Sequence, residues 1–123
     1  MSANIWPNFN ASLVPPSPKR IIDQAGEGLK DKTKGVVVFY TGSIMIEDDM
    51  AKLRCVLSTP QLSYHYPFMT VKYSVANPYP VSITADKMEE VVVNNEKELT
   101  ASLIKIFNAP TTIDTIQKLM SLA

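Results

Sequence analysis

Apolar residues alternate with polar ones along residues 61–86, and the alternation changes phase once. An even-numbered apolar set is followed by an odd-numbered one: Leu62, Tyr64, Tyr66 and Phe68, then Met69, Val71, Tyr73 and Val75. Successive side chains of a strand point to opposite faces, so a phase change turns half of the apolar set toward water. A β-bulge inserts the extra residue that prevents this. The stretch therefore predicts a strand with a bulge or bend near Pro67.

Other segments have strand patterns as well. Residues 36–40 are apolar on both parities, which predicts a central strand, and residues 44–46 continue it or begin another. Residues 51–57 alternate clearly, with Lys52 and Arg54 on the side away from Leu53 and Cys55, and this is typical of a half-buried antiparallel strand. Residues 81–84 and 91–93 predict two shorter strands.

Helix signals stand at both ends of the chain. Ser17 before Pro18 is a favourable helix start, although two glycines shortly afterwards favour an early end. Asn95 with Glu98 predicts a capped helix that stops near residue 108. Thr111 with Asp114 predicts the start of a last helix, whose inner face is formed by Ile113, Ile116, Leu119 and Met120.

The order of these elements predicts the fold class. Strands in the middle with helices at the ends favour an α+β fold rather than alternating βα units. We expect a mainly antiparallel sheet of roughly four to five strands, one N-terminal helix, and a C-terminal helical hairpin packed on one face of the sheet.

The chain divides into an arm and one domain. Residues 1–16 contain three prolines and scattered apolar residues, which predicts an extended arm, and residues 17–123 form a single domain. A free tail is usually polar, so Trp6, Phe9, Leu13 and Val14 predict that the arm packs on its own domain or on a second copy.

Composition excludes several classes of function. Twelve Lys and Arg balance 12 Asp and Glu, and this disfavours a general nucleic-acid binder; only Lys52, Arg54 and Lys72 offer charge near the tyrosines. No apolar run approaches the ~20 residues that cross a bilayer, and no basic leader precedes an apolar segment. We expect a soluble, cytoplasmic protein without a membrane contact and without a cofactor.

His65 is the candidate for acid–base chemistry because its ordinary pKa lies near neutrality. The alternative hypothesis is a small enzyme or ligand-binding pocket that uses His65 with Tyr66 or Tyr64. The parity of the strand opposes it, since His65 projects away from both tyrosines unless the strand is bent. One histidine and one cysteine, Cys55, do not make a His/Cys zinc site, and Cys55 falls on the inward parity of its strand.

The main hypothesis is therefore interaction without catalysis. Four of the five tyrosines fall within residues 64–79, and tyrosine is enriched at protein interfaces. The alternative is that these rings fill the core with their hydroxyls at its rim. We predict a small interaction or assembly domain, adaptor-like or immunity-like, whose partner is another protein or a second copy in a homo-oligomer. The candidate binding residues are Tyr64, His65, Tyr66, Tyr73, Tyr79 and Trp6.

Overall fold

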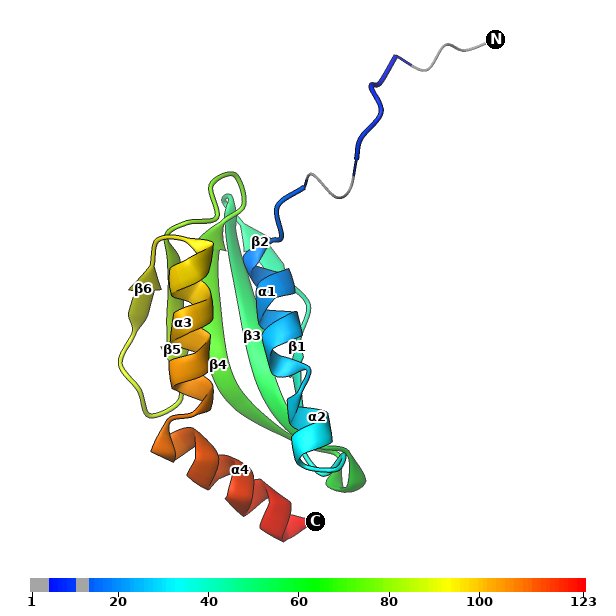
Figure 1. The fold of residues 1–123 in the computed structure, drawn as a ribbon, viewed down its shortest axis with the longest axis vertical. Helices are drawn as coiled ribbons and strands as arrows, with labels where there is room; N and C mark the ends of the chain where they lie inside the picture. The colour runs from blue at the N-terminus through cyan, green and yellow to red at the C-terminus, as the bar shows by residue number, and fades with distance from the viewer. Residues whose placement is uncertain (1–4, 11–13) are drawn as a thin grey trace.

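A computed structural model describes residues 5–10 and 14–123. One sheet and four helices make up the domain (Figure 1). In chain order the elements are α1 (Pro18–Gly26), α2 (Leu29–Lys32), β1 (Val38–Thr41), β2 (Met45–Glu47), β3 (Met50–Thr59), a 3-10 turn (Pro60–Leu62), β4 (Tyr64–Ser74), β5 (Val81–Ala85), β6 (Val91–Val93), α3 (Glu96–Phe107) and α4 (Pro110–Leu122).

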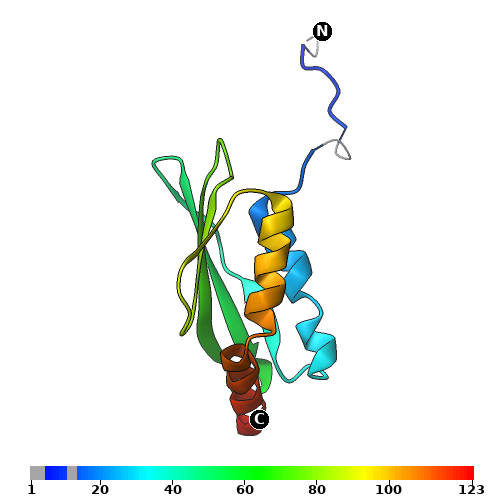
Figure 2. The ribbon, with the colours of Figure 1, turned by 60° about the vertical axis from the view of Figure 1, so that its left-hand side comes forward.

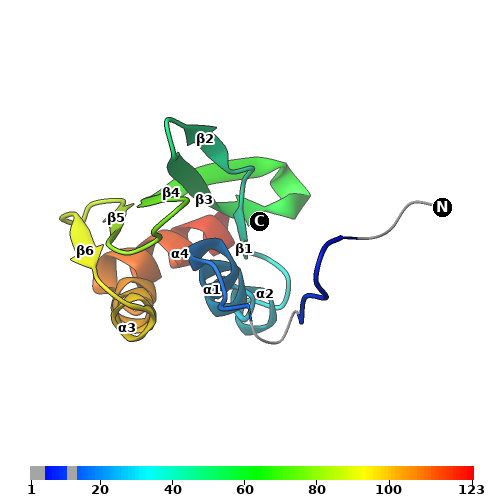
Figure 3. The same cartoon turned by 90° about the horizontal axis from the view of Figure 1, so that it is seen from above.

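The sheet has six strands, and every pairing is antiparallel. Its order is β1-β3-β4-β5-β6, and β2 pairs with β3 as well. Helices α1 and α3 lie side by side on one face, while α4 crosses one end of the sheet (Figures 1 and 2). The view from above places these helices on the same side (Figure 3). The predicted α+β fold with an antiparallel sheet, an N-terminal helix and two C-terminal helices is confirmed.

The hydrophobic core lies between this sheet and its helices. Its fully buried side chains come from both layers, with Ile22 and Leu103 on helices and Leu53, Val71 and Ile83 on strands. At one end of the core the rings of Phe39, Phe68 and Phe107 pack together, with centroids 5.4–6.5 Å apart. Burial of alternate strand residues against helices fixes which face of each strand points inward.

The predicted bulge is present in β4. The register between β3 and β4 shifts between Cys55 and Val56, so that Met69 pairs with Cys55 and Pro67 pairs with Val56. Phe68 is the extra residue, and Phe68 and Met69 are both buried. Because of this shift, Tyr66 before the bulge and Met69, Val71 and Tyr73 after it point toward the helices.

Strand β1 corrects one prediction. The apolar run at residues 36–40 favoured a central strand, but β1 is an edge strand, paired only with β3 among the described strands. Packing against the helices buries two residues of this run, Val37 and Phe39, whereas Tyr40 is exposed. Val37 is fully buried, and the Thr33 hydroxyl bonds to both its amide nitrogen and its carbonyl oxygen. The Thr33 side chain thus satisfies the backbone polar groups of Val37, the residue that precedes β1.

The sequence predicted the start of α3 correctly and that of α4 less well. Asn95 caps α3 as predicted, accepting a bond of 2.8 Å from the Glu98 amide. Helix α4 begins at Pro110 and not after Thr111, because proline suits the first helical position. Its predicted inner face is also wrong in part. Thr112, Thr115 and Leu119 are buried, whereas Ile113 and Met120 are exposed.

The described part of the N-terminal arm runs away from the sheet and helices (Figure 1). Ile5, Trp6, Phe9 and Val14 are all exposed, and Leu13 lies outside the described residues. These exposed side chains do not form the predicted close packing on their own domain. Across the described ranges, 5–10 and 14–123, no helix has both the length and the apolar character for a membrane span.

Candidate interaction surface

The face of the sheet turned away from α1 and α3 is here called the open face. Within the described chain no helix lies over it (Figures 2 and 3). Residues paired across an antiparallel sheet share a face, so the register assigns its members. They are Val38 and Tyr40 of β1, Met45 and Glu47 of β2, Met50, Lys52, Arg54, Val56 and Ser58 of β3, His65, Pro67, Thr70, Lys72 and Ser74 of β4, Ser82 and Thr84 of β5, and Val92 of β6.

Three cations, Lys52, Arg54 and Lys72, lie together in the middle of the open face and are here called the basic cluster. Lys52 lies directly opposite Lys72, and Arg54 lies opposite Thr70. Like charges directly opposite each other on a sheet are destabilising, by roughly 0.2–1 kcal/mol. Among described residues, ion pairs join only Lys19 to Asp23 and Lys118 to Asp114. The basic cluster therefore has no ion-paired carboxylate in the described chain.

A groove runs along the basic cluster at the place where the bulge bends β4. It measures about 830 Å³ and is floored by strands β3, β4 and β5. Lys52, Arg54 and Thr70 line it from the sheet, and the loop at residues 86–89 forms a wall. The bulge thus shapes the open face as well as keeping apolar residues turned to the helices.

His65 lies on the open face beside Tyr40. The Tyr40 hydroxyl is 2.7 Å from His65 Nδ1, and the two rings meet edge to face. Tyr66, the next residue, points to the opposite face and its hydroxyl donates to Asp86 Oδ2. His65 and Tyr66 are therefore not brought together, as the strand parity predicted.

The other predicted binding residues are scattered. Tyr73 is only 5% exposed and packs in the core, while Tyr79 is half-buried with no hydrogen-bond partner for its hydroxyl among described residues. Burial raises the pKa of both phenols. Tyr64 is exposed on the helix side of the sheet at its end, and Trp6 lies on the arm. The tyrosines of residues 64–79 mainly face the helices rather than one exposed surface.

The bond to Asp86 has a clear electrostatic effect on Tyr66. It raises the pKa of Tyr66 to about 12, and burial and the negative charge of Asp86 add to the shift. A protonated phenol is therefore favoured in the folded protein, which opposes its use as a base.

Cys55 is fully buried beneath α1. Burial, followed by the negative charge of Asp23, raises the pKa of its thiol to about 12. A reactive cysteine needs the opposite environment, exposed and electropositive. Cys55 thus has the environment of a structural thiol, on the inward side that its parity predicted.

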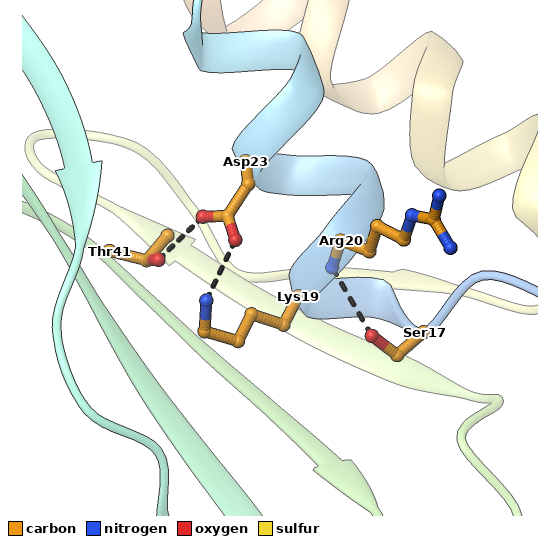
Figure 4. Close-up of polar contacts among 5 residues, drawn as sticks. All are labelled: Ser17, Lys19, Arg20, Asp23 and Thr41. Atoms are coloured by element: carbon orange, nitrogen blue, oxygen red, sulfur yellow. Dashed lines mark hydrogen bonds and ion pairs between the residues drawn. The ribbon is translucent and has the colours of Figure 1, made fainter.

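Polar contacts from α1 fix the edge strand β1, and sequence reasoning missed them (Figure 4). Asp23 accepts a bond of 2.5 Å from the Thr41 hydroxyl and forms an ion pair of 2.7 Å with Lys19. Ser17 caps the same helix by accepting from the Arg20 amide at 3.2 Å. Only the four-residue spacing of Lys19 and Asp23 was visible in the sequence. The contact with Thr41 required knowledge of the fold.

The covered side contains a small apolar cavity of about 200 Å³ between the α1–α2 turn and α4. The three packed phenylalanines line it together with Leu57 and Ile116. Few polar groups face this space, so it offers apolar contact rather than chemistry. Within the described ranges no three His, Cys, Asp or Glu side chains are placed to hold a metal ion.

Comparisons with known proteins found no matching family model, no similar curated protein and no similar solved structure.

Proposed function

We propose that this chain is a non-catalytic protein-interaction domain whose partner packs on the open face of the sheet. The observation that carries the proposal is the unequal cover of the sheet, with helices on one face and none of the described helices on the other. A solvated sheet face is normally polar. Here Met45 is 62% exposed and Val92 is 53% exposed, and Tyr40 and Met50 are exposed as well.

Flexible and amphipathic side chains of this kind support binding. Methionine adapts its shape to a partner, and tyrosine combines apolar area with a polar tip. Met45 and Met50 lie on neighbouring strands at one end of the face, and Tyr40 lies on an edge strand. The basic cluster lies between the two methionines and Tyr40, so the face offers both apolar and charged contacts, as interfaces do.

The enzyme alternative has less support. It needed His65 and a neighbouring tyrosine in one pocket, but His65 and Tyr66 lie on opposite faces of the sheet. His65 contacts Tyr40 instead, at an exposed position. A general base must be held within hydrogen-bond distance of the substrate, usually in a site that excludes water. The exposed position of His65 on an open sheet does not provide such a site.

Self-association through the open face also has less support than a different partner. Two copies related by a two-fold axis present the same patch to each other. The basic cluster of one molecule then lies opposite or beside the same cluster of the second molecule, and the cations repel each other. The exposed apolar residues of the arm remain the alternative contact for a second copy.

The test is affinity capture of the tagged full-length chain from its source cells, followed by native mass spectrometry. Thr70 lies at the centre of the open face, and Thr100 is exposed on α3. Thr70→Trp places bulk on the open face, and Thr100→Trp is the same change on the helix layer. We expect one discrete protein partner with the unaltered chain and with Thr100→Trp, and its loss with Thr70→Trp.

Circular dichroism melts show whether both variants stay folded. Equal recovery of the partner by the folded Thr70→Trp variant contradicts the proposal, and so does recovery of the bare monomer alone. A homo-oligomer that survives Thr70→Trp moves self-association to another surface.

A further inference from the structure

We infer that the partner presents an acidic polypeptide segment, which lies in extended form across Lys52, Arg54 and Lys72. This inference rests on the proposed function, because it names the chemistry that the open face recognises. It goes beyond that function by committing to one kind of partner segment and to three residues that contact it.

The charge of the basic cluster is not balanced by a carboxylate within ion-pair distance among the described residues. Lys52 and Lys72 are paired across the sheet, and Arg54 is the next residue of β3 on the same face. Glu47 lies diagonally from Lys52, but no ion pair joins it to the cluster among the described residues. Repulsion between the two ammonium groups opposes folding, and an anionic group placed between them removes it.

The spacing of the three cations matches the side-chain repeat of an extended peptide. Lys52 and Arg54 are two residues apart on one strand, which separates their attachment points by ~7 Å. Lys72 stands ~5 Å from Lys52 on the neighbouring strand. An extended peptide repeats its side chains on one face at the same ~7 Å interval. Acidic residues at alternate positions of such a segment therefore match the cluster, and the guanidinium of Arg54 suits a carboxylate.

The carboxylates near the basic cluster favour a peptide over a nucleic acid. Glu89 lies in the wall of the groove that holds Lys52 and Arg54, together with Lys87 and with Asp86, whose carboxylate accepts from the Tyr66 hydroxyl. Glu47 lies on the other side of the cluster. A nucleic acid carries a negative phosphate at every nucleotide, so phosphates next to these carboxylates are repelled by them. The chain as a whole has no net charge to attract a polyanion. A peptide avoids this repulsion because its acidic residues can be confined to the basic cluster. The apolar residues that follow them in the peptide then contact Met45 and Met50.

The experiment measures fluorescence anisotropy of a labelled, end-blocked 12-residue peptide that alternates Glu with Val. A peptide with Gln in place of Glu and a single-stranded DNA 12-mer are the comparison probes. The protein is the full chain, unaltered or carrying Lys72→Glu or Lys97→Glu. Lys97 is exposed on α3, so its replacement makes the same change in net charge away from the open face.

We expect the Glu peptide to bind the unaltered chain and Lys97→Glu about equally, and Lys72→Glu at least tenfold more weakly. Binding should weaken with salt, and the Gln peptide should bind poorly. The melting temperature should stay the same or rise in Lys72→Glu, because a cross-strand ion pair replaces repulsion. A residue with only a structural role does not lose binding while the fold gains stability.

Equal binding by folded Lys72→Glu, or no binding of the Glu peptide, overturns the inference. Tighter binding of the DNA 12-mer than of the peptide overturns it in favour of a nucleic acid. If Thr70→Trp still abolishes capture of a partner, the proposed function stands while this inference fails.

Discussion

On the face of the sheet that α1 and α3 cover, Leu53, Val71 and Ile83 are fully buried. On the opposite face, the neighbouring residues Arg54 and Lys72 of the same strands are exposed. Strands β3 and β4 thus place buried apolar residues on one face and charged residues on the other. Because alternate residues serve different faces, the sequence of the open face is free to vary its charge without disturbing the core.

The largest expected effect on stability comes from comparing two adjacent residues of β3, one on each face. Leu53→Ala removes a fully buried side chain and leaves a cavity, so we expect the free energy of unfolding to fall by about 2–5 kcal/mol. Arg54→Ala, on the open face, should change it by less than about 0.5 kcal/mol. Urea denaturation at pH 7 measures both. Similar losses for the two variants would remove the distinction between the faces.

A smaller effect concerns how closely α1 approaches the covered face. A Cβ atom at Gly26 would stand 2.0 Å from Cδ1 of Phe39, whose ring is held by Phe68 and Phe107. We expect Gly26→Ala to lower the free energy of unfolding by about 1–3 kcal/mol, as overpacking does. Gly28 is the matched control, because a Cβ there meets nothing within 4 Å and its φ of −71° suits any residue.

Gly28→Ala should therefore change the free energy of unfolding by no more than about 1 kcal/mol in either direction. Thermal melts followed by circular dichroism compare the two glycines. If Gly26→Ala is as stable as Gly28→Ala, the helix does not lie as close to Phe39 as the structure places it.

Much of the fold could be predicted from the sequence because the relevant signals are local. The phase change at Phe68 and Met69 gave the bulge, and Asn95 with Glu98 gave the start of α3. The inner face of α4 could not be predicted from hydrophobicity. Thr112 is buried because its hydroxyl donates to the Ile106 carbonyl at 2.6 Å, a bond between two helices that depends on how they meet.

The candidate surface was less predictable for a related reason. Lys52 and Arg54 share a parity, which the sequence shows. That Lys72 stands opposite Lys52 depends on the register between β3 and β4, and the register depends on the bulge. The tyrosines were conspicuous in the sequence, but Tyr73 is buried against the helices. Residue type alone does not say which face of a strand a helix will cover.

The smallest effect compares two tyrosines whose hydroxyls lie on opposite faces. Tyr66 donates to Asp86 on the covered side, and Tyr40 contacts His65 on the open side. Tyr66→Phe should lower the free energy of unfolding by roughly 0.5–1.5 kcal/mol, the usual net value of one hydrogen bond. Tyr40→Phe, at an exposed site, should change it by less than about 0.5 kcal/mol. Urea denaturation of both variants at pH 7 gives the comparison.

The pH dependence of the Tyr66→Phe deficit tests whether folding favours the protonated phenol. The pKa of Tyr66 is raised from 10.0 to about 12 in the folded protein, so folding favours the protonated phenol. Its contribution is fully present below pH 10 and is lost as the pH rises through about 12. The deficit of Tyr66→Phe should therefore be constant from pH 7 to 9 and shrink above pH 10. A deficit that persists unchanged near pH 12 would show that folding does not raise the pKa of Tyr66, which would contradict a hydrogen bond from its protonated hydroxyl to Asp86.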